Sequence, residues 1–156
     1  VDDDVSKAKI KSLISISNKT KTPVLFSKST YPYKAIGILV NNDFGESTSN
    51  SIAFDLGSSL SASLVAVNIT QPKFLQSEDT AKLTDSLEKM QDLALSYQVQ
   101  LDFENHEGNE AKIFSELSSQ FDLSIIGNGK NQSWQSKKTT EFISNNSKSS
   151  VLYIPS

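Results

Sequence analysis

Residues 35–40 of the chain read Ala-Ile-Gly-Ile-Leu-Val, and the turn-forming residues Asn-Asn-Asp-Phe-Gly follow at 41–45. An unbroken apolar run of this length is typical of a strand buried on both faces of a parallel sheet. Directly after the turn, Ile52, Leu56 and Leu60 recur at helical spacing. The stretch therefore predicts a strand, a turn and a helix, which together begin an α/β fold.

The same alternation of strands and helices continues to the C-terminus. Further strands are expected at 64–67, 99–103, 121–127 and 151–155, with helices at 83–94, 110–119 and 135–144. This order predicts right-handed crossovers and a parallel sheet with helices on both faces. Ligands of such sheets bind beyond the carboxyl ends of the strands, where the strand order reverses. The loops at 41–46 and 127–133 are therefore the candidate ligand-binding loops.

The composition excludes several kinds of site. The chain has 156 residues, enough for one domain or for one domain with an appendage. It has no cysteine and one histidine, His106, which excludes disulfides, thiolate nucleophiles and Cys- or His-rich metal sites. We expect His106 to be an exposed loop residue, and we predict neither a catalytic residue nor a metal site. No run of 18 apolar residues occurs, so we expect no direct insertion into a membrane.

The charge is divided unevenly along the chain. Residues 1–34 carry seven Lys and three Asp, whereas residues 35–156 carry eight Lys and fifteen acidic residues. The larger segment therefore repels the phosphate backbone of a nucleic acid. The chain also has no arginine, the residue best suited to forked contacts with phosphate or guanine. Nucleic acid is not an expected partner.

Two segments of the chain echo each other. Residues 16–26 read Ile-Ser-Asn-Lys-Thr-Lys-Thr-Pro-Val-Leu-Phe, and residues 143–153 read Ile-Ser-Asn-Asn-Ser-Lys-Ser-Ser-Val-Leu-Tyr, with six of eleven positions identical at an offset of 127. One interpretation is chance in a chain rich in Ser, Lys and Asn. The other is a tandem repeat. In that case residues 1–30 are the last helix and strand of a preceding repeat unit, 31–34 are a linker, and 35–156 are a complete domain.

Several segments, taken in order, resemble the motifs of one known family. Residues 38–47 resemble an "ILVPTDFSE-S" opening, and Asn50, Ala53 and Phe54 continue this likeness into the helix. Residues 107–111 resemble "GDPAEAI", residues 121–127 resemble "ADLIVMG", and residues 149–155 resemble "CPVLVVP". On these motifs, residues 34–156 resemble the universal stress protein family, the UspA-like domain. Residues 16–26 resemble the end of the same domain.

The resemblance implies a fold and a function. The fold is a Rossmann-like, adenine nucleotide alpha hydrolase-like three-layer sandwich with a five-stranded, mostly parallel sheet. The function is that of a non-catalytic regulatory binding module of the stress response, not of an enzyme. With the missing cysteines, it also implies a cytoplasmic protein. Two alternatives are a sensor that binds ATP or AMP and the cytosolic regulatory domain of a cation/proton antiporter.

Family members also pair the last edge strand with a second copy or with the other tandem domain. Here the edge strand is expected at 151–155, and residues 23–27 of the N-terminal segment are the expected partner strand. Such pairing covers an edge whose backbone N–H and C=O groups are otherwise unpaired. A dimer through the same edge is the alternative arrangement.

The nucleotide motif of the family is only partly present. ATP-binding members carry Gly-x-x-Gly, then nine residues, then Gly-Ser or Gly-Thr. Gly127 matches the first position, whereas the second falls on Lys130, with the neighbouring glycine displaced to Gly129. The final pair falls on Thr140 and Glu141. The resemblance thus implies a degenerate nucleotide loop, with ATP as the one candidate cofactor.

The residues present still offer some of the chemistry that a phosphate needs. Gly127, Asn128 and Gly129 allow backbone N–H groups to approach an anion, and Lys130 adds a positive charge. A hydroxyl is available from Thr139 or Thr140, whereas Glu141 repels phosphate if it faces the loop.

Asp43 matches the acidic position that contacts adenosine in nucleotide-binding members. Its alternative role is to cap the helix that follows. The candidate nucleotide site therefore comprises Asp43, Gly127, Asn128, Gly129, Lys130, Thr139 and Thr140.

Overall fold

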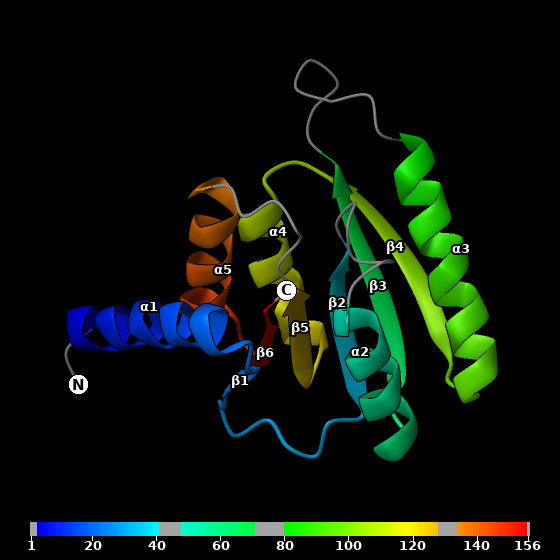
Figure 1. Ribbon diagram of the computed structural model, residues 1–156, viewed down its shortest axis with the longest axis horizontal. Helices are drawn as coiled ribbons and strands as arrows, with labels where there is room; N and C mark the ends of the chain where they lie inside the picture. Colours follow the sequence, from blue (N-terminus) through cyan, green and yellow to red (C-terminus); the bar gives the residue numbers. More distant parts are fainter. Residues whose placement is uncertain (1–2, 41–47, 71–79, 128–133, 156) are drawn as a thin grey trace.

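The computed structural model describes residues 3–40, 48–70, 80–127 and 134–155 (Figure 1). The helices are α1 (Asp3–Thr20), α2 (Thr48–Ser59), α3 (Thr80–Tyr97), α4 (Glu110–Leu117) and α5 (Trp134–Asn146), and a 3₁₀ turn, η3 (Ser118–Gln120), follows α4. The strands are β1 (Val24–Phe26), β2 (Ala35–Val40), β3 (Ser63–Thr70), β4 (Leu101–Glu107), β5 (Leu123–Gly127) and β6 (Ser150–Ile154). The predicted alternation of strands and helices is confirmed from β2 to β6.

The sheet has six strands in the order β1-β6-β5-β2-β3-β4, one more than the five expected. Neighbouring strands from β2 to β6 are parallel, as the unbroken apolar runs predict. The sixth strand is β1, which lies antiparallel to β6 at the edge of the sheet. The additional strand therefore comes from the N-terminal segment and leaves the predicted parallel order unchanged.

Helices cover both faces of the sheet and complete three layers (Figure 1). Side chains of β2 alternate between two cores. Ile36 and Ile38 pack with Phe54 of α2, whereas Leu39 packs with Phe114 of α4. Apolar residues of α2, α3, α4 and α5 contribute to these cores, and no helix in the described ranges is long and apolar enough to cross a lipid bilayer.

Gly37 lies in the middle of β2, where there is no room for a side chain. A Cβ atom at this position would lie 2.2 Å from the ring of Phe121. The ring is 6% exposed and belongs to the core on the α4 and α5 side of the sheet. Glycine is therefore needed here because an aromatic ring already fills the space beside the strand.

The N-terminal segment is paired with the last strand, as the expected pairing of 23–27 with 151–155 requires. Leu25 lies opposite Leu152, and Phe26 lies opposite Val151. The hydroxyl of the buried Tyr153 donates a hydrogen bond of 2.5 Å to Asn18 Oδ1, which attaches α1 to β6. Within this chain, therefore, residues of α1 and β1 pack on the sheet as part of the fold.

The segment between β1 and β2 is fixed by hydrogen bonds at the amino ends of the strands. Asp122 Oδ2 accepts from the backbone N–H groups of Lys34 and Ala35, both at 2.9 Å. Thr30 Oγ1 donates to the carbonyl oxygen of Asp122 at 2.6 Å, and the N–H of Lys28 donates to Ser150 Oγ at 2.9 Å. Residues 31–34, expected as a linker, are thus held at both ends by hydrogen bonds to Asp122, from Thr30 on one side and from Lys34 on the other.

Strand β4 extends further than the sequence indicates. The expected strand ended near 103, but β4 continues to Glu107 and pairs along β3. His106 therefore lies in a strand opposite Ile69, not in a loop as expected, and its side chain is 33% exposed. The polar residues 104–107 gave no apolar alternation because β4 is an edge strand with no fully buried residue.

We expect Gly37→Ala to lower the free energy of unfolding by about 1–3 kcal/mol, because the new methyl group overpacks against Phe121. Urea denaturation of the purified chain measures this. In the double variant with Phe121→Leu, we expect the penalty of the alanine to shrink, because the ring that it meets is gone. An unchanged midpoint for Gly37→Ala alone would contradict the packing described here.

Candidate functional site

The carboxyl ends of β2 and β5 lie side by side at the point where the strand order reverses. From β2 the sheet continues through β3 and β4 in one direction, and through β5 and β6 in the other. Leu39 lies opposite Ile126, so the two strands end together at Val40 and Gly127. Both candidate loops leave the sheet at this switch point, where open α/β sheets bind their ligands.

The described residues contain three of the seven predicted site residues. Gly127 is buried as the last residue of β5, and Thr139 and Thr140 lie on α5. Asp43, Asn128, Gly129 and Lys130 lie outside the described residues. The structure thus places Gly127 at the switch point, and the role of the other loop residues stays a prediction.

The two threonines lie in the second turn of α5, beyond its first four N–H groups. Helix α5 begins at Trp134, so Thr140 is about 9 Å further along the helix axis. Only the first four N–H groups of a helix lack a partner inside it. Thr140 is 4% exposed, and Thr139 is half-buried. Contact of these hydroxyls with a ligand is still a prediction, and it requires a ligand that reaches the second turn of α5.

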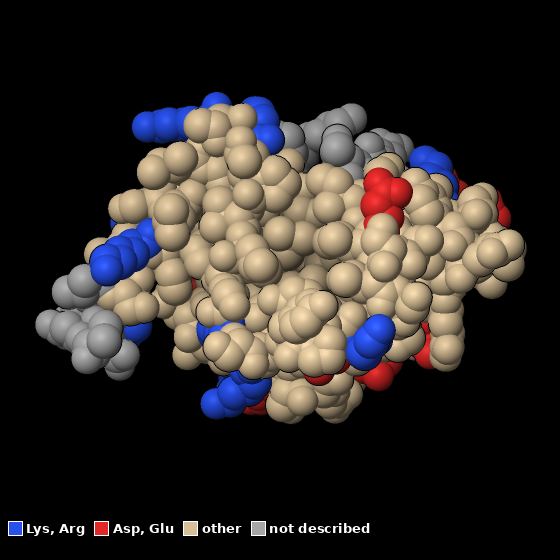
Figure 2. Space-filling model, turned by 90° about the horizontal axis from the view of Figure 1, so that it is seen from below, with Lys and Arg blue, Asp and Glu red and all other residues tan. Residues whose placement is uncertain are grey.

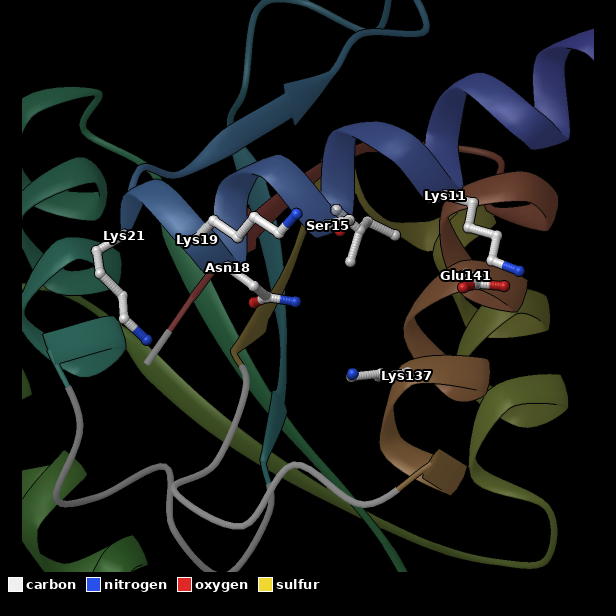
Figure 3. Close-up of a pocket in the computed structure, with 8 residues that line it drawn as sticks. Lys11, Ser15, Asn18, Lys19, Lys21, Lys137 and Glu141 are labelled. Carbon is white, nitrogen blue, oxygen red and sulfur yellow. The ribbon is translucent and has the colours of Figure 1, made fainter.

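Glu141 was expected to repel phosphate if it faced the loop. Instead, it lines a groove between α5 and α1, together with Lys11 of α1 and Lys137 of α5. Figure 3 shows the Lys11 side chain extending toward Glu141. The negative charge of Glu141 therefore belongs to the surface shared with α1.

Asn50 is a residue at this end of the sheet that sequence reasoning used only as a family likeness. It lies in the first turn of α2, three and four residues before the buried Ala53 and Phe54, so all three share the face that covers the sheet. Its side chain is 2% exposed, and within the described part of the chain neither Oδ1 nor Nδ2 has a hydrogen-bond partner. A buried amide without partners is costly, and it offers one donor and one acceptor side by side.

Glu110 is a second residue that sequence reasoning missed. It occupies the first turn of α4, which follows the carboxyl end of β4, while the preceding Asn109 caps the helix by accepting from the N–H of Lys112 at 2.9 Å. Burial raises the pKa of Glu110 from its ordinary 4.5 to about 6. A carboxyl that titrates near neutral pH at the ligand end of a sheet is a candidate functional group.

Known structures share this arrangement of strands and helices. A universal stress protein UspA from Lactobacillus plantarum superposes with a TM-score of 0.65 at 17% identity, over 78% of this chain and 97% of that one. This is the universal stress protein fold. No protein-family model matches the sequence, and no curated protein sequence does either.

Of two further structures with the universal stress protein fold, one is a longer chain and the other has AMP bound. A universal stress protein from Archaeoglobus fulgidus has a TM-score of 0.67 at 11% identity, over 94% of this chain but only 53% of that one. A universal stress protein family protein from Arabidopsis thaliana with AMP bound has a TM-score of 0.56 at 13% identity, over 78% of this chain and 91% of that one. At these identities the similarity establishes the fold alone.

We expect stability to fall as pH rises through the pKa of Glu110. Because the folded state holds the proton up to about pH 6 and the unfolded state loses it near 4.5, ionisation costs stability at neutral pH. Glu110→Gln should therefore raise the free energy of unfolding at pH 8 by about 1–2 kcal/mol and have little effect at pH 4. Thermal denaturation at both pH values measures this.

The matched control is Glu116→Gln on the same helix, where the side chain is exposed and neither pH should show a difference. If Glu110→Gln shifted stability equally at pH 4 and pH 8, the change would come from packing and not from titration.

Proposed function

We propose that this chain is a universal stress protein-type domain that acts as a non-catalytic, cytoplasmic binding module of a stress response. The observation that carries the proposal is the switch point. Two loops that resemble the family's ligand-binding motifs leave adjacent strands there, in a sheet with the universal stress protein fold. The candidate binding residues lie at or follow the carboxyl ends of β2 and β5, and β6 provides the edge that pairs with β1.

An adenine nucleotide is the ligand that we propose for this module. The Arabidopsis thaliana protein of the same fold was solved with AMP bound, which supports this chemistry. Asn50 supplies a second, independent argument, because its amide lacks both partners at the ligand end of the sheet. An amide of this kind matches the adjacent donor and acceptor of an adenine edge. The departures from the Gly-rich motif lead us to expect weaker phosphate contacts than in members with the full motif.

We also propose that residues 1–30 are the closing helix and strand of a preceding repeat unit. The two echoing segments contain matching structure, since the end of α1 and β1 correspond to the end of α5 and β6. When residues are matched at the offset of 127, the pairing of β1 with β6 is symmetric. Leu25 lies opposite Leu152, its own equivalent, and the flanking pairs exchange equivalent positions across it.

Such a pairing is what two copies of one unit produce around a twofold axis. The matched lengths fit this proposal, because the Archaeoglobus fulgidus protein matches 94% of this chain with about half its own length. Exposed apolar side chains on the N-terminal segment, Leu13, Ile16 and Leu25, are 42–53% exposed and are available to the remainder of such a unit.

Nucleotide binding is tested by denaturing the purified chain, separating released nucleotide by anion exchange, and titrating ATP and AMP by calorimetry. In Asn50→Leu we expect weaker nucleotide binding together with a free energy of unfolding higher by about 1 kcal/mol, because an unpartnered buried amide is replaced by an apolar group. Asn105→Leu is the control, since the Asn105 Oδ1 already accepts from Asn68 at 3.2 Å at the exposed sheet edge. Wild-type protein that neither carries nor binds nucleotide would refute this ligand.

The repeat proposal is tested by deleting residues 1–34. This exposes the edge of β6, and Leu152 can then face Leu152 of a second copy in place of Leu25. We expect the full chain to elute as a monomer and the shortened chain as a dimer in size exclusion with light scattering. Circular dichroism confirms that the shortened chain is folded. A folded monomer would show that β1 does not occupy the place of a second copy.

A further inference from the structure

A groove of about 400 Å³ runs between α1 and α5. Its lining includes Ile14, Ser15 and Asn18 of α1 and Glu141 of α5, together with four lysines, which are Lys11, Lys19, Lys21 and Lys137. Figure 3 shows Lys11 beside Glu141 at one end of the space between α1 and α5, and Lys21, just after the end of α1, at the other. The volume falls in the range of small-molecule sites.

The charge of the groove is opposite to that of the chain. Among the described residues, four lysines and one carboxylate line the groove, whereas the whole chain has a net charge of −3. Figure 2 shows lysine side chains gathered mainly over the α1 side of the molecule, with most of the visible carboxylates on the other side. Cations that converge on one concave surface repel each other, and a bound anion relieves this repulsion.

The lysines mark two ends of the groove. Lys11 and Lys19 are eight residues apart on α1, which corresponds to about 12 Å along the helix axis. Lys137 lies on the opposite wall, in the first turn of α5, where the helix dipole also favours a negative charge. A single phosphate therefore cannot contact both ends at once, whereas a molecule with several phosphate groups can.

Asn18 lines the groove with an amide whose orientation is fixed by a hydrogen bond. Its Oδ1 accepts the hydrogen bond from the buried Tyr153, so the oxygen is directed toward β6. Figure 3 shows the Asn18 nitrogen on the side that faces Lys137. The Asn18 amide thus presents a donor to the groove on the side of Lys137.

We propose that the groove between α1 and α5 binds a small anion that carries two or more phosphate groups. Among the described residues, the lining of this groove includes none of the residues predicted to bind a nucleotide. The groove has one wall from α1 and one from α5, so it exists only when the N-terminal segment is packed on the domain. Binding of the anion therefore indicates that α1 is in contact with α5.

Inorganic tripolyphosphate is the probe, titrated by calorimetry into the full chain at about 0.05 M and about 0.3 M salt. We expect one site that weakens at the higher salt, and much weaker binding of orthophosphate. Lys19→Gln with Lys137→Gln should weaken tripolyphosphate binding by about tenfold or more. Glu141→Gln should strengthen it, because the one carboxylate of the groove is removed.

The matched control is Lys7→Gln with Lys138→Gln, which removes the same charge from the same two helices. These two residues line the neighbouring groove, which shares Lys11 and Glu141 with the proposed site, and they do not line the site itself. This control should bind within about twofold of the wild type. Circular dichroism checks that each variant is folded. Absence of binding to the wild type, an equal loss in both double variants, or weaker binding in Glu141→Gln would each overturn the proposal.

Discussion

Residues 36–40 of β2 are shielded from water on both faces and both edges, and this constraint organises the fold. Their N–H and C=O groups cannot bond to solvent, so strands are needed on both sides. Strands β3 and β5 supply these bonds from opposite sides. Because the chain reaches β3 directly and β5 only later, the strand order reverses beside β2. The burial of β2 and the position of the candidate ligand site thus have one cause.

The same constraint explains which parts of the fold could be predicted from the sequence. A strand that is buried on both faces is mostly apolar, and the runs in β2, β5 and β6 showed this, with the buried Ser124 and Ser150 as hydrogen-bonded exceptions. The end of β4 could not be predicted in this way. Residues such as Glu104 and His106 are accepted at the sheet edge, where side chains remain in contact with water.

The candidate site was predictable only where it depends on the backbone. Gly127 could be placed because it ends a recognisable strand. The missing hydrogen-bond partners of Asn50 and the raised pKa of Glu110 result from packing between elements distant in sequence, and an Asn or Glu in a first helical turn has no such signature. The lysine-lined groove likewise joins α1 to α5, and only the packed chain brings these helices together.

The anchoring of the segment between β1 and β2 has a mechanical consequence. Asp122 and Thr30 fasten this segment at the amino ends of the strands, whereas the candidate ligand loops leave from the carboxyl ends. A pull on the N-terminal segment is therefore carried first by the Asn18–Tyr153 hydrogen bond and the β1–β6 pairing, and then by the bonds to Asp122. The load thus enters the sheet at β6 and not at the central strand β2, so the domain can be tethered through its N-terminal segment without a direct pull on β2.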